Sequence, residues 1–435
     1  MADKQSTKPP AGTRDFLPDD VRRREYVIGV VRDVYERYGF EPLETPSFEN
    51  IETLLGKYGD ESNKLIFKIL KRGEHEASGE ADLALRYDLT VPLARVVAQY
   101  QNDLPKFFKR YQIQPVWRAD RPAKGRFREF YQCDIDSIGS KSPIVEAEIL
   151  SAVAEILQTL GFTDFLIRLN HRRVLSSLLG VAGVPAEQHD EALVALDKLD
   201  KIGRDGVAKE FALRGIGDAA ASKALSYFVD EEAFDILGHA NEGVANLIAI
   251  RELAKETPAN GHIKIDATLA RGLSYYTGAI MEIAVPDLAG SLGGGGRYDN
   301  LVGMFLGHDV PACGFSLGLE RIIVVMTERN MFPPDVVRGA VDILVTIWND
   351  VSEADALALA GDLRRAGVRV ELYPEADKLG KQFKYASSRN VPFVAVVGDE
   401  ERSRGEVAIK DLRSGEQTAV RRADAGSFVR EHLAR

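Results

Sequence analysis

The segment over residues 106–128, KFFKRYQIQPVWRADRPAKGRFR, reverses the charge of the chain around it. It holds eight Lys or Arg residues and one acid, Asp120, whereas the 435-residue chain carries a formal net charge of −10. The planar guanidinium group of arginine matches phosphate and carboxylate oxygens in two-point contacts, so this concentration favours a site for a polyanion. On charge alone, a solvated basic hairpin that aids solubility is a second interpretation.

Strand and turn signals give this segment a shape. An aromatic and β-branched run over 107–117 precedes a loop that contains Pro122 and Gly125, and a second strand-like run covers 130–138. This pattern predicts an antiparallel hairpin that carries the basic residues in its loop.

Length and composition set further limits. A chain of this length is expected to form two or three domains, and its 45% hydrophobic and 28% charged residues are typical of a globular protein. No apolar run approaches the roughly 20 residues that cross a bilayer, and MADKQSTKPPAGTRDF lacks the apolar core of a secretory signal. With Cys133 and Cys313 as the only cysteines, we expect buried thiols, a reducing cytoplasm, no membrane contact and no metal site.

Hydrophobic periodicity predicts helices and strands in the first part of the chain. Apolar residues at 3–4 spacing predict a helix over 22–38, and FEPLETPSF predicts a strand that ends or breaks at Pro46. Further expected elements, in chain order, are a helix over 142–160, strands over 262–265 and 275–285, a separating glycine cluster GSLGGGGRYDN, and a helix over 318–329.

Two regions differ from this mixture. Residues 172–256 are rich in Ala, Leu and charged residues and predict a bundle of short helices, which we interpret as an inserted domain. Beyond an expected linker at 330–338, strand signals in VDILVTI, VRVELY and VPFVAVVG alternate with helix signals over 353–366 and 378–390. That alternation predicts a parallel sheet with helices on its faces, in a separate α/β domain.

Three other segments carry residues suited to ligand binding. In LALRYDLTVPLAR, the residues Arg86, Asp88 and Thr90 alternate with apolar neighbours, which predicts that they share one face of a strand. A carboxylate beside a hydroxyl on that face can hold an ammonium group. A solvent-facing polar stripe is the alternative.

The second and third segments are LARGLSYYTG (269–278) and GFSLGLERI (314–322). The former places Arg271 before two adjacent tyrosines in a strand-forming context. Because side chains alternate, Tyr275 and Tyr276 are expected on opposite faces unless the strand is bulged, and core roles for both are the alternative. In the latter, Arg321 is expected on a helix after a glycine-rich turn, where a lone arginine is also common on the surface.

In this order, the segments resemble the signature motifs of the class II aminoacyl-tRNA synthetases, and within that class the histidyl-tRNA synthetase family. The helix and strand ending at Pro46 resemble motif 1, the hairpin over 107–136 resembles motif 2, and GFSLGLERI resembles motif 3. LARGLSYYTG resembles a peptide particular to the histidine enzymes, and GTRDFLP at 12–18 resembles the family's N-terminal signature. The resemblance covers essentially the whole chain.

The resemblance implies an α/β fold with an α+β catalytic core, in which helices flank an antiparallel sheet. It implies four parts: the first part of the catalytic core with motifs 1 and 2 (1–171), a helical insertion domain (172–256), the second part of the core with the histidine-specific peptide and motif 3 (257–330), and an anticodon-binding α/β domain (338–435).

The implied activity is that of a histidine–tRNA ligase. Such an enzyme activates L-histidine with ATP, used as its Mg²⁺ complex, to histidyl-adenylate and pyrophosphate. It then transfers histidine to the 3′ end of histidine tRNA. The implied partners are L-histidine, ATP, histidine tRNA and a second copy of the chain in a cytoplasmic homodimer.

The resemblance also implies roles for individual residues. The implied catalytic residues, at the α-phosphate, are Arg118 and Arg271. The implied ATP-binding residues are Arg118, Arg126, Phe130, which would stack on adenine, and Arg321. The implied histidine-binding residues are Asp88, Thr90, Arg118, Gln132, Asp136, Arg271, Tyr275 and Tyr276. No residue is assigned to a protein-held metal.

The chemistry of amino-acid activation agrees with this set. Attack by a carboxylate on the α-phosphate concentrates negative charge there, and the nucleophile is already ionised at neutral pH, so this step needs no general base. Fixed cations align the two anions and stabilise charge as it builds, which suits three arginines without a catalytic His or Cys.

Ala123 departs from the family pattern. Many bacterial members have glutamine after the proline of the motif 2 loop, where it contacts the extra 5′ guanosine of histidine tRNA, so how this chain reads that nucleotide stays open.

Three other classes of protein share part of this pattern. They are the synthetase-like regulatory subunit of ATP phosphoribosyltransferase, a synthetase for proline, threonine or glycine, and an RNA-binding module. The retained Arg118, Arg271 and Arg321 and the C-terminal domain argue against the first. LARGLSYYTG argues against the second, and a set of phosphate-binding arginines beside a polar pocket argues against the third.

Overall fold

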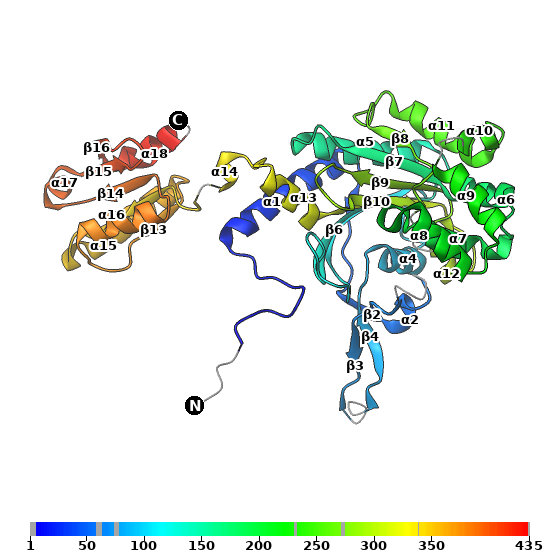
Figure 1. The fold of residues 1–435 in the computed structure, drawn as a ribbon. Helices are drawn as coiled ribbons and strands as arrows, with labels where there is room; N and C mark the ends of the chain where they lie inside the picture. Colours follow the sequence, from blue (N-terminus) through cyan, green and yellow to red (C-terminus); the bar gives the residue numbers. More distant parts are fainter. Residues whose placement is uncertain are drawn as a thin grey trace. The chain divides into compact units, whose positions relative to one another are not determined.

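The computed structural model describes residues 6–57, 63–73, 78–229, 233–270, 275–337 and 339–433. The chain divides into two compact units, Met1–Phe332 and Pro333–Arg435 (Figure 1).

The first unit is built on an eight-stranded sheet with the order β1-β5-β6-β11-β10-β9-β7-β8. Its strands are β1 (Glu41–Pro42), β5 (Phe108–Trp117), β6 (Glu129–Ile138), β7 (Leu166–His171), β8 (Ile263–Ile265), β9 (Ala279–Ala284), β10 (Ser291–Arg297) and β11 (Ala312–Gly318). The central strands, from β5 to β7 in the sheet order, are antiparallel to their neighbours, whereas the edge strands β1 and β8 pair in parallel. The antiparallel sheet expected for the core is confirmed.

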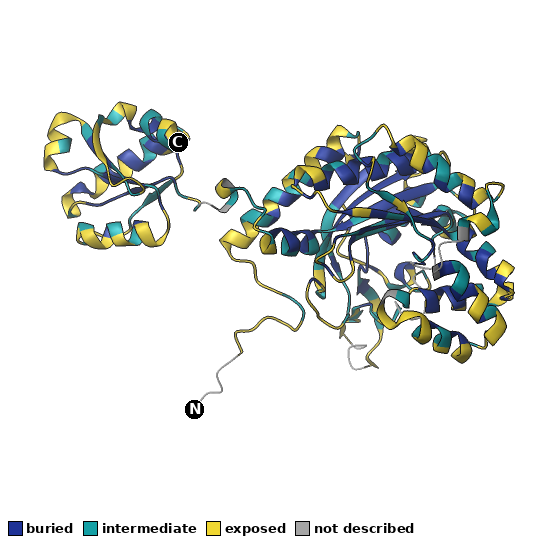
Figure 2. Ribbon diagram, turned by 45° about the horizontal axis from the view of Figure 1, so that its top comes forward, coloured by how far each residue is buried: buried dark blue, intermediate teal, exposed yellow. Residues whose placement is uncertain are grey.

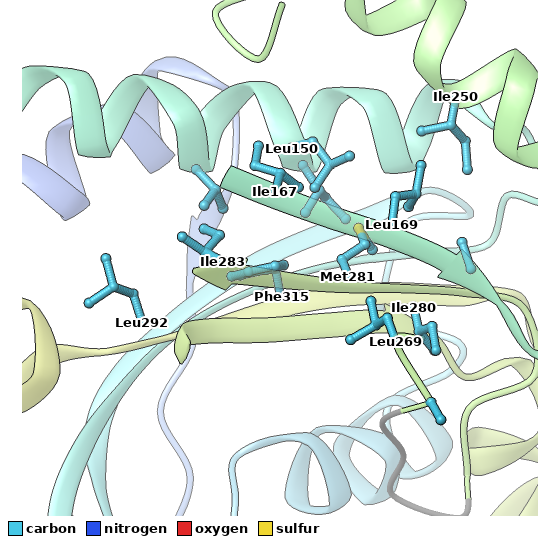
Figure 3. Close-up of a cluster of buried hydrophobic side chains, with 14 of the residues drawn as sticks. Leu150, Ile167, Leu169, Ile250, Leu269, Ile280, Met281, Ile283, Leu292 and Phe315 are labelled. Carbon is cyan, nitrogen blue, oxygen red and sulfur yellow. The ribbon is translucent and has the colours of Figure 1, made fainter. Parts of the chain in front are cut away.

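One face of this sheet is apolar. Because side chains alternate along a strand, residues paired across neighbouring strands share a face. One such row consists of Tyr111, Ile135, Phe315, Met281 and Leu169. In Figure 3, Leu150 of the overlying helix lies above Ile167 of β7, next to Met281 and Ile283 of β9. This face therefore forms the main hydrophobic core.

Helices pack over the apolar face. They are α1 (Pro18–Arg37), α5 (Ile144–Thr159), α11 (Glu242–Ala254) and α13 (Leu319–Glu328). In Figure 2 the sheet strands are buried while these helices keep exposed outer surfaces. The first helix starts four residues before its expected start because Pro18 fits the first helical position and Asp19 and Asp20 favour the positive helix end.

A helical segment follows β7. Its helices are α6 (Arg172–Ala182), η2 (Ala186–Gln188), α7 (His189–Leu196), α8 (Leu199–Leu213), α9 (Asp218–Val229), α10 (Ala233–Leu237) and α11. The expected short helices are confirmed. Their buried side chains, including Leu175, Leu179 and Phe211, belong to the same hydrophobic cluster as the sheet residues, so the segment shares its core with the sheet.

A three-stranded sheet with the order β2-β4-β3 lies beside the basic hairpin. Its strands are β2 (Phe48–Asn50), β3 (Lys68–Leu70) and β4 (Ala81–Leu85). Short helices α2 (Ile51–Leu54), α4 (Thr90–Gln99) and α12 (Asp299–Leu306) pack around it over a second hydrophobic cluster.

The C-terminal unit contains a five-stranded sheet with the order β13-β12-β14-β15-β16. Its strands are β12 (Ile343–Val345), β13 (Val370–Leu372), β14 (Phe393–Val396), β15 (Glu406–Asp411) and β16 (Gln417–Arg421). Its helices are α14 (Pro334–Val337), η3 (Asp350–Ser352), α15 (Glu353–Arg365), α16 (Leu379–Ser388), α17 (Asp399–Arg404), η4 (Arg422–Asp424) and α18 (Ala425–Leu433). The first three strands are parallel, as expected, and β15 and β16 add an antiparallel hairpin that the sequence did not predict.

Two expectations about local structure are wrong. The glycine cluster expected to separate two elements is itself strand β10, in the middle of the sheet. The glycine-rich turn expected before Arg321 is strand β11, which leads directly into α13. Glycine fits both strands because side chains here would strike neighbouring backbone: a Cβ on Gly295 would lie 2.2 Å from the carbonyl oxygen of Gly314.

Within the described residues, no helix combines the length and the apolar character that crossing a membrane requires.

Candidate active site

The second face of the large sheet is polar. One row of paired residues on this face runs across seven strands: Gln112, Asp134, Ser316, Gly294, Glu282, Arg168 and Lys264. A parallel row begins with Arg110, Asp136, Gly314 and Gly296. Large polar groups therefore stand on β5 and β6, while β10 and β11 contribute glycine and serine and leave space above the sheet.

The basic hairpin is present as expected. β5 and β6 pair from Phe108 opposite Ile138 to Trp117 opposite Glu129, with a loop between them. The loop is closed by backbone hydrogen bonds from Arg118 to Arg128 (2.9 Å) and between Ala123 and Arg126. Its folded form, rather than its charge alone, fixes where its cations stand.

Arg118 lies at the end of β5 against two aromatic rings. Its Nε donates to the carbonyl oxygen of Tyr87 (3.0 Å), and its guanidinium carbon lies 4.3 Å from the ring centre of Tyr87 and 5.2 Å from that of Phe130. Arg118 and Phe130, expected to contact the α-phosphate and adenine, are thus brought together. Their proximity suits a nucleotide whose base and phosphate are bound side by side.

Arg321 approaches the same loop from α13. Its Nε donates to the carbonyl oxygen of Gly125 (3.2 Å), and its Nη1 donates to that of Ser291. Arg126, on the loop, pairs with Asp120 at 2.9 Å while half of its side chain stays exposed. All four residues expected to bind ATP therefore border one loop.

Several of the residues expected to bind histidine are buried polar side chains joined by hydrogen bonds, here called the polar pocket. Asp88 is 2% exposed; its Oδ1 accepts the N–H of Val91 (3.1 Å) and its Oδ2 accepts the hydroxyl of Tyr275 (3.4 Å). Thr90, half-buried, is the first residue of α4. Gln132, on β6, donates from Nε2 to Oγ of Ser316 (2.7 Å).

Asp136 stands at the inner end of this pocket. Its Oδ2 lies 2.8 Å from Nη2 of Arg110, and its Oδ1 accepts the hydroxyl of Tyr298. The ring of Tyr298 in turn contacts Tyr275, with centroids 6.0 Å apart. Asp136 and Asp88 are thereby linked through two tyrosines.

Space for the carboxylate of Asp136 depends on Gly314. A Cβ at position 314 would lie 1.9 Å from Oδ1 of Asp136, well inside van der Waals contact. Gly314 thus makes room for this side chain, and also for the backbone of β6, where the carbonyl oxygen of Ile135 would lie 2.9 Å from the same Cβ.

Three carboxylates, those of Asp88, Asp134 and Asp136, face one buried guanidinium, that of Arg110. Burial raises the pKa of Asp134 to about 7; Arg110 and a hydrogen bond with Ser316 oppose the shift, and Asp136 and Asp88 add to it. Burial likewise raises the pKa of Asp136. A bound cation such as an ammonium group would favour the ionised forms of these carboxylates and lower their pKa values, so the pocket suits a cationic ligand.

Several of these residues were not singled out in the sequence. Arg110 was counted only among the basic residues of the segment 106–128, but it is fully buried and faces Asp136. The alternation of Arg110, Gln112 and Gln114 along β5, opposite Asp136, Asp134 and Gln132 on β6, is the signal that locates this polar face.

The strand expected over 86–90 is absent. β4 ends at Leu85 and α4 begins at Thr90, so Arg86 and Asp88 do not share a strand face. Arg86 turns away and donates to the carbonyl oxygens of Thr45 (2.7 Å) and Pro115 (2.9 Å). It is fully buried, which also excludes the alternative of a solvent-facing stripe.

The expectation for the two tyrosines is also wrong. Tyr275 and Tyr276 precede β9, so strand alternation does not apply, and their rings contact each other with centroids 5.1 Å apart. Arg271, in the same segment, lies outside the described residues. Tyr275 is buried and Tyr276 half-buried at the edge of the pocket.

An exposed aromatic side chain lies near the end of a parallel strand in the C-terminal unit. Trp348 follows β12 and is 43% exposed. The preceding residue, Ile347, is held by the buried Gln382, whose amide exchanges hydrogen bonds with its N–H (3.0 Å) and carbonyl oxygen (2.7 Å). β12 lies between β13 and β14, where the strand order changes direction, and such points are common ligand sites.

The eight-stranded sheet of the first unit, with its basic hairpin and its polar pocket, defines an aminoacyl-tRNA synthetase of class II. A family model described as histidyl-tRNA synthetase matches residues 12–322, and one described as anticodon binding domain matches residues 341–432. The chain belongs to the histidyl-tRNA synthetase family, whose known reaction is the two-step attachment of histidine to its tRNA, and its activity falls in the ligase class.

Individual relatives agree with this membership. A histidine–tRNA ligase of Christiangramia forsetii is 42% identical over 96% of this chain and 97% of its own length. The crystal structure of histidyl-tRNA synthetase from Nostoc sp. PCC 7120 is similar with a TM-score of 0.80 and 32% identity, covering 99% of this chain and 100% of that chain. A structure from Bacillus halodurans described as an ATP phosphoribosyltransferase regulatory subunit/histidyl-tRNA synthetase shares the fold (TM-score 0.73, 21% identity, 89% of this chain and 98% of that chain).

Proposed function

We propose that the polar face of the sheet binds histidine and ATP side by side and joins them as histidyl-adenylate. The observation that carries this proposal is the position of Arg118. It contacts the ring of Phe130, and its hydrogen bond to the carbonyl oxygen of Tyr87 holds it next to the segment that carries the buried Asp88.

Within this proposal the histidine ammonium group binds near Asp88 and Thr90. Both imidazole nitrogens need hydrogen-bonding partners, and Asp136, Gln132 and the tyrosines Tyr275 and Tyr276 supply them. A pocket built on buried hydrogen bonds rejects analogues that lack the matching groups far more strongly than an apolar pocket does. This is the source of selectivity for histidine.

The arginines act on the nucleotide. Arg118 and Arg271 hold the α-phosphate and the histidine carboxylate at attacking distance, Phe130 stacks on adenine, and Arg126 and Arg321 bind the outer phosphates. The carboxylate oxygen attacks the α-phosphorus, the bond to the β-phosphate bridging oxygen breaks, and pyrophosphate leaves. The fixed guanidinium groups stabilise the charge that builds on the non-bridging oxygens.

Magnesium is proposed to enter with ATP as part of the substrate. Among the described residues, no group of three or more His, Cys, Asp or Glu side chains is arranged to hold a metal ion. Phosphate oxygens and water are the usual main ligands of Mg²⁺ in nucleotide sites. The ion therefore needs few ligands from the protein.

Three further proposals concern the whole molecule. Residues 172–256 form an insertion that contacts the tRNA acceptor stem, between the core parts 1–171 and 257–330. Residues 338–435 bind the anticodon, where single-stranded bases stack on aromatic side chains. The protein works in the cytoplasm.

The protein is also proposed to be a homodimer through motif 1. Exposed apolar side chains near this region support the proposal: Phe48 is 50% exposed on β2 and Phe107 is 59% exposed before β5. Light scattering after gel filtration should give twice the mass of the chain, and Phe48→Asp with Phe107→Asp should halve it. A monomeric wild type contradicts this proposal.

The test of the enzymatic proposal is histidine-dependent ATP–pyrophosphate exchange, with proline, threonine and glycine run alongside. Exchange is expected with histidine only, and Arg118→Ala or Arg271→Ala should abolish it with the fold intact. Lys124→Ala is the matched control, because this cation of the same loop pairs with Glu328 at 2.8 Å and is 63% exposed. Wild-type protein that shows no exchange with any of these amino acids would refute the proposed function.

A further inference from the structure

We propose that residues 12–16, here called the N-terminal strap, position the basic loop for ATP before the nucleotide binds. This inference rests on the proposed ATP site and adds positioning residues outside it. The strap is part of the GTRDFLP signature, to which the reaction itself assigns no role.

The strap is seated on the returning arm of the loop by its backbone. The N–H of Arg128 donates to the carbonyl oxygen of Gly12 (2.8 Å). Gly12 has φ +86°, and a Cβ there would lie 2.7 Å from Cγ of Arg128. Glycine is therefore required at position 12 both for its conformation and for the close approach of Arg128.

Side chains of the strap continue this contact as a ladder of alternating rings and cations. The guanidinium carbon of Arg14 lies 3.5 Å from the ring centre of Phe127 in the loop and 4.9 Å from that of Phe16. Arg24 of α1 covers Phe16 at 4.1 Å and Tyr131 of β6 at 4.8 Å. The ladder thus runs from the loop through the strap to the start of β6.

The far end of the ladder is anchored in the core. Nη1 of Arg24 lies 2.7 Å from Oε1 of Glu320, and Oε2 of Glu320 accepts the N–H of Tyr131 (2.9 Å). Both charged side chains are buried. Glu320 directly precedes Arg321, which holds the loop at Gly125 from the other side.

The loop needs such support because its own charges repel one another. It carries five cations, Arg118, Arg121, Lys124, Arg126 and Arg128, with Asp120 as its acid. Before ATP neutralises them, like charges favour an open loop. A strap that stacks on Phe127, between Arg126 and Arg128, keeps both cations in place and so lowers the ordering cost that ATP binding must meet.

The experiment compares Arg14→Ala with Arg23→Ala in the full-length protein. Arg23 is the matched control: it also lies over a phenylalanine ring, Phe332 at 5.6 Å, but away from the loop. For Arg14→Ala we expect KM for ATP in pyrophosphate exchange to rise about tenfold, equal to about 1.4 kcal/mol. KM for histidine and the melting temperature should stay at their wild-type values, and Arg14→Lys, which keeps the charge without the flat surface, should be intermediate.

Hydrogen exchange of the ligand-free protein provides a readout that does not depend on catalysis. Amides of residues 119–128 should exchange faster in Arg14→Ala than in wild type. In Arg23→Ala their exchange rates should equal those of wild type. Unchanged loop exchange in Arg14→Ala overturns the proposal even if the enzyme proves active on histidine. A lower kcat, together with KM values for ATP and histidine that rise by the same factor and a lower melting temperature, also overturns the proposal. Such a result indicates a general structural role for Arg14. Faster amide exchange in Arg14→Ala than in wild type, together with no pyrophosphate exchange by the wild type, would instead support the strap and refute the proposed reaction.

Discussion

Arg110 and Asp136 face each other across β5 and β6, with Nη2 of the guanidinium 2.8 Å from Oδ2 of the carboxylate and both side chains closed to solvent. The pair lies on the polar face of the sheet. Its guanidinium supplies the counter-charge of a buried carboxylate, so loss of either partner is expected to destabilise the fold.

Replacing Arg110 with methionine should destabilise the protein strongly. Loss of one partner leaves Asp136 buried without its counter-charge, which costs about 3–5 kcal/mol. We expect a clear fall in the urea midpoint of unfolding. Unfolding can be monitored by tryptophan fluorescence, because Trp117 lies near the site. Lys124→Met, which removes an exposed ion pair, should cost less than about 1 kcal/mol. Equal midpoints for the two variants would contradict the importance of burial.

Gly314→Ala should fill the space that Asp136 occupies. Since the new Cβ would lie 1.9 Å from Oδ1 of Asp136, this side chain must move away from Tyr298. KM for histidine is expected to rise by about tenfold or more, with a smaller change in KM for ATP. The control is Gly180→Ala on α6, where no atom lies within 4 Å of the new Cβ; it should leave both constants unchanged. A KM for histidine equal to the wild-type value in Gly314→Ala would exclude a role for Asp136 in binding histidine.

The pKa of Asp134 predicts a specific dependence of stability on pH. In the folded protein this pKa is about 7, above the ordinary value of 3.8, so between about pH 4 and pH 7 the folded state binds more protons than the unfolded state. The contribution of Asp134 to stability is therefore fully present below about pH 4 and declines until about pH 7. Asp134→Asn should remove this decline, so the difference in urea midpoint between wild type and variant should narrow or reverse with rising pH. A constant difference would mean that Asp134 titrates normally.

Trp348→Ala should separate the two steps of the reaction. If an RNA base stacks on this exposed indole, losing it costs about 1–3 kcal/mol and lowers kcat/KM for histidine tRNA by about tenfold or more. Pyrophosphate exchange needs no tRNA and should be unchanged. Trp348→Phe should retain most of the activity. Val351→Ala is the control, because Val351 is an exposed apolar residue of the same turn. Normal charging of tRNA by Trp348→Ala would exclude the stacking role.

Much of the site could be predicted because its signals are local. The hairpin was visible in aromatic and β-branched runs around a Pro/Gly loop, and α13 with Arg321 was visible in its periodicity. The structure confirms both elements. For Arg118, Phe130 and Arg321, local patterns and the family resemblance pointed to one site, and the structure places them around one loop.

What failed depended on contacts between distant segments. Arg110 was counted among the basic residues of 106–128 without a role, because nothing near it in the chain shows that Asp136 pairs with it; that pairing comes from the strand register. The segment from Arg86 to Thr90 alternates as a strand does, but hydrogen bonds from Arg86 to Thr45 and Pro115 bend it out of the sheet. The glycines of β10 appeared as a spacer because glycine is a poor strand former, and only the crowding of neighbouring strands explains their place.

The glycines of β10 and β11 also limit how this enzyme can escape an inhibitor. The floor of the site is backbone, and a side chain at Gly314 would strike Asp136 while one at Gly296 would strike the carbonyl oxygen of Ala279 at 2.5 Å. Resistance mutations commonly add or exchange side chains at the contact surface, and a side chain added at Gly314 or Gly296 would first displace atoms of the protein itself. A compound that makes its main contacts with this floor would therefore leave the protein few viable routes to resistance.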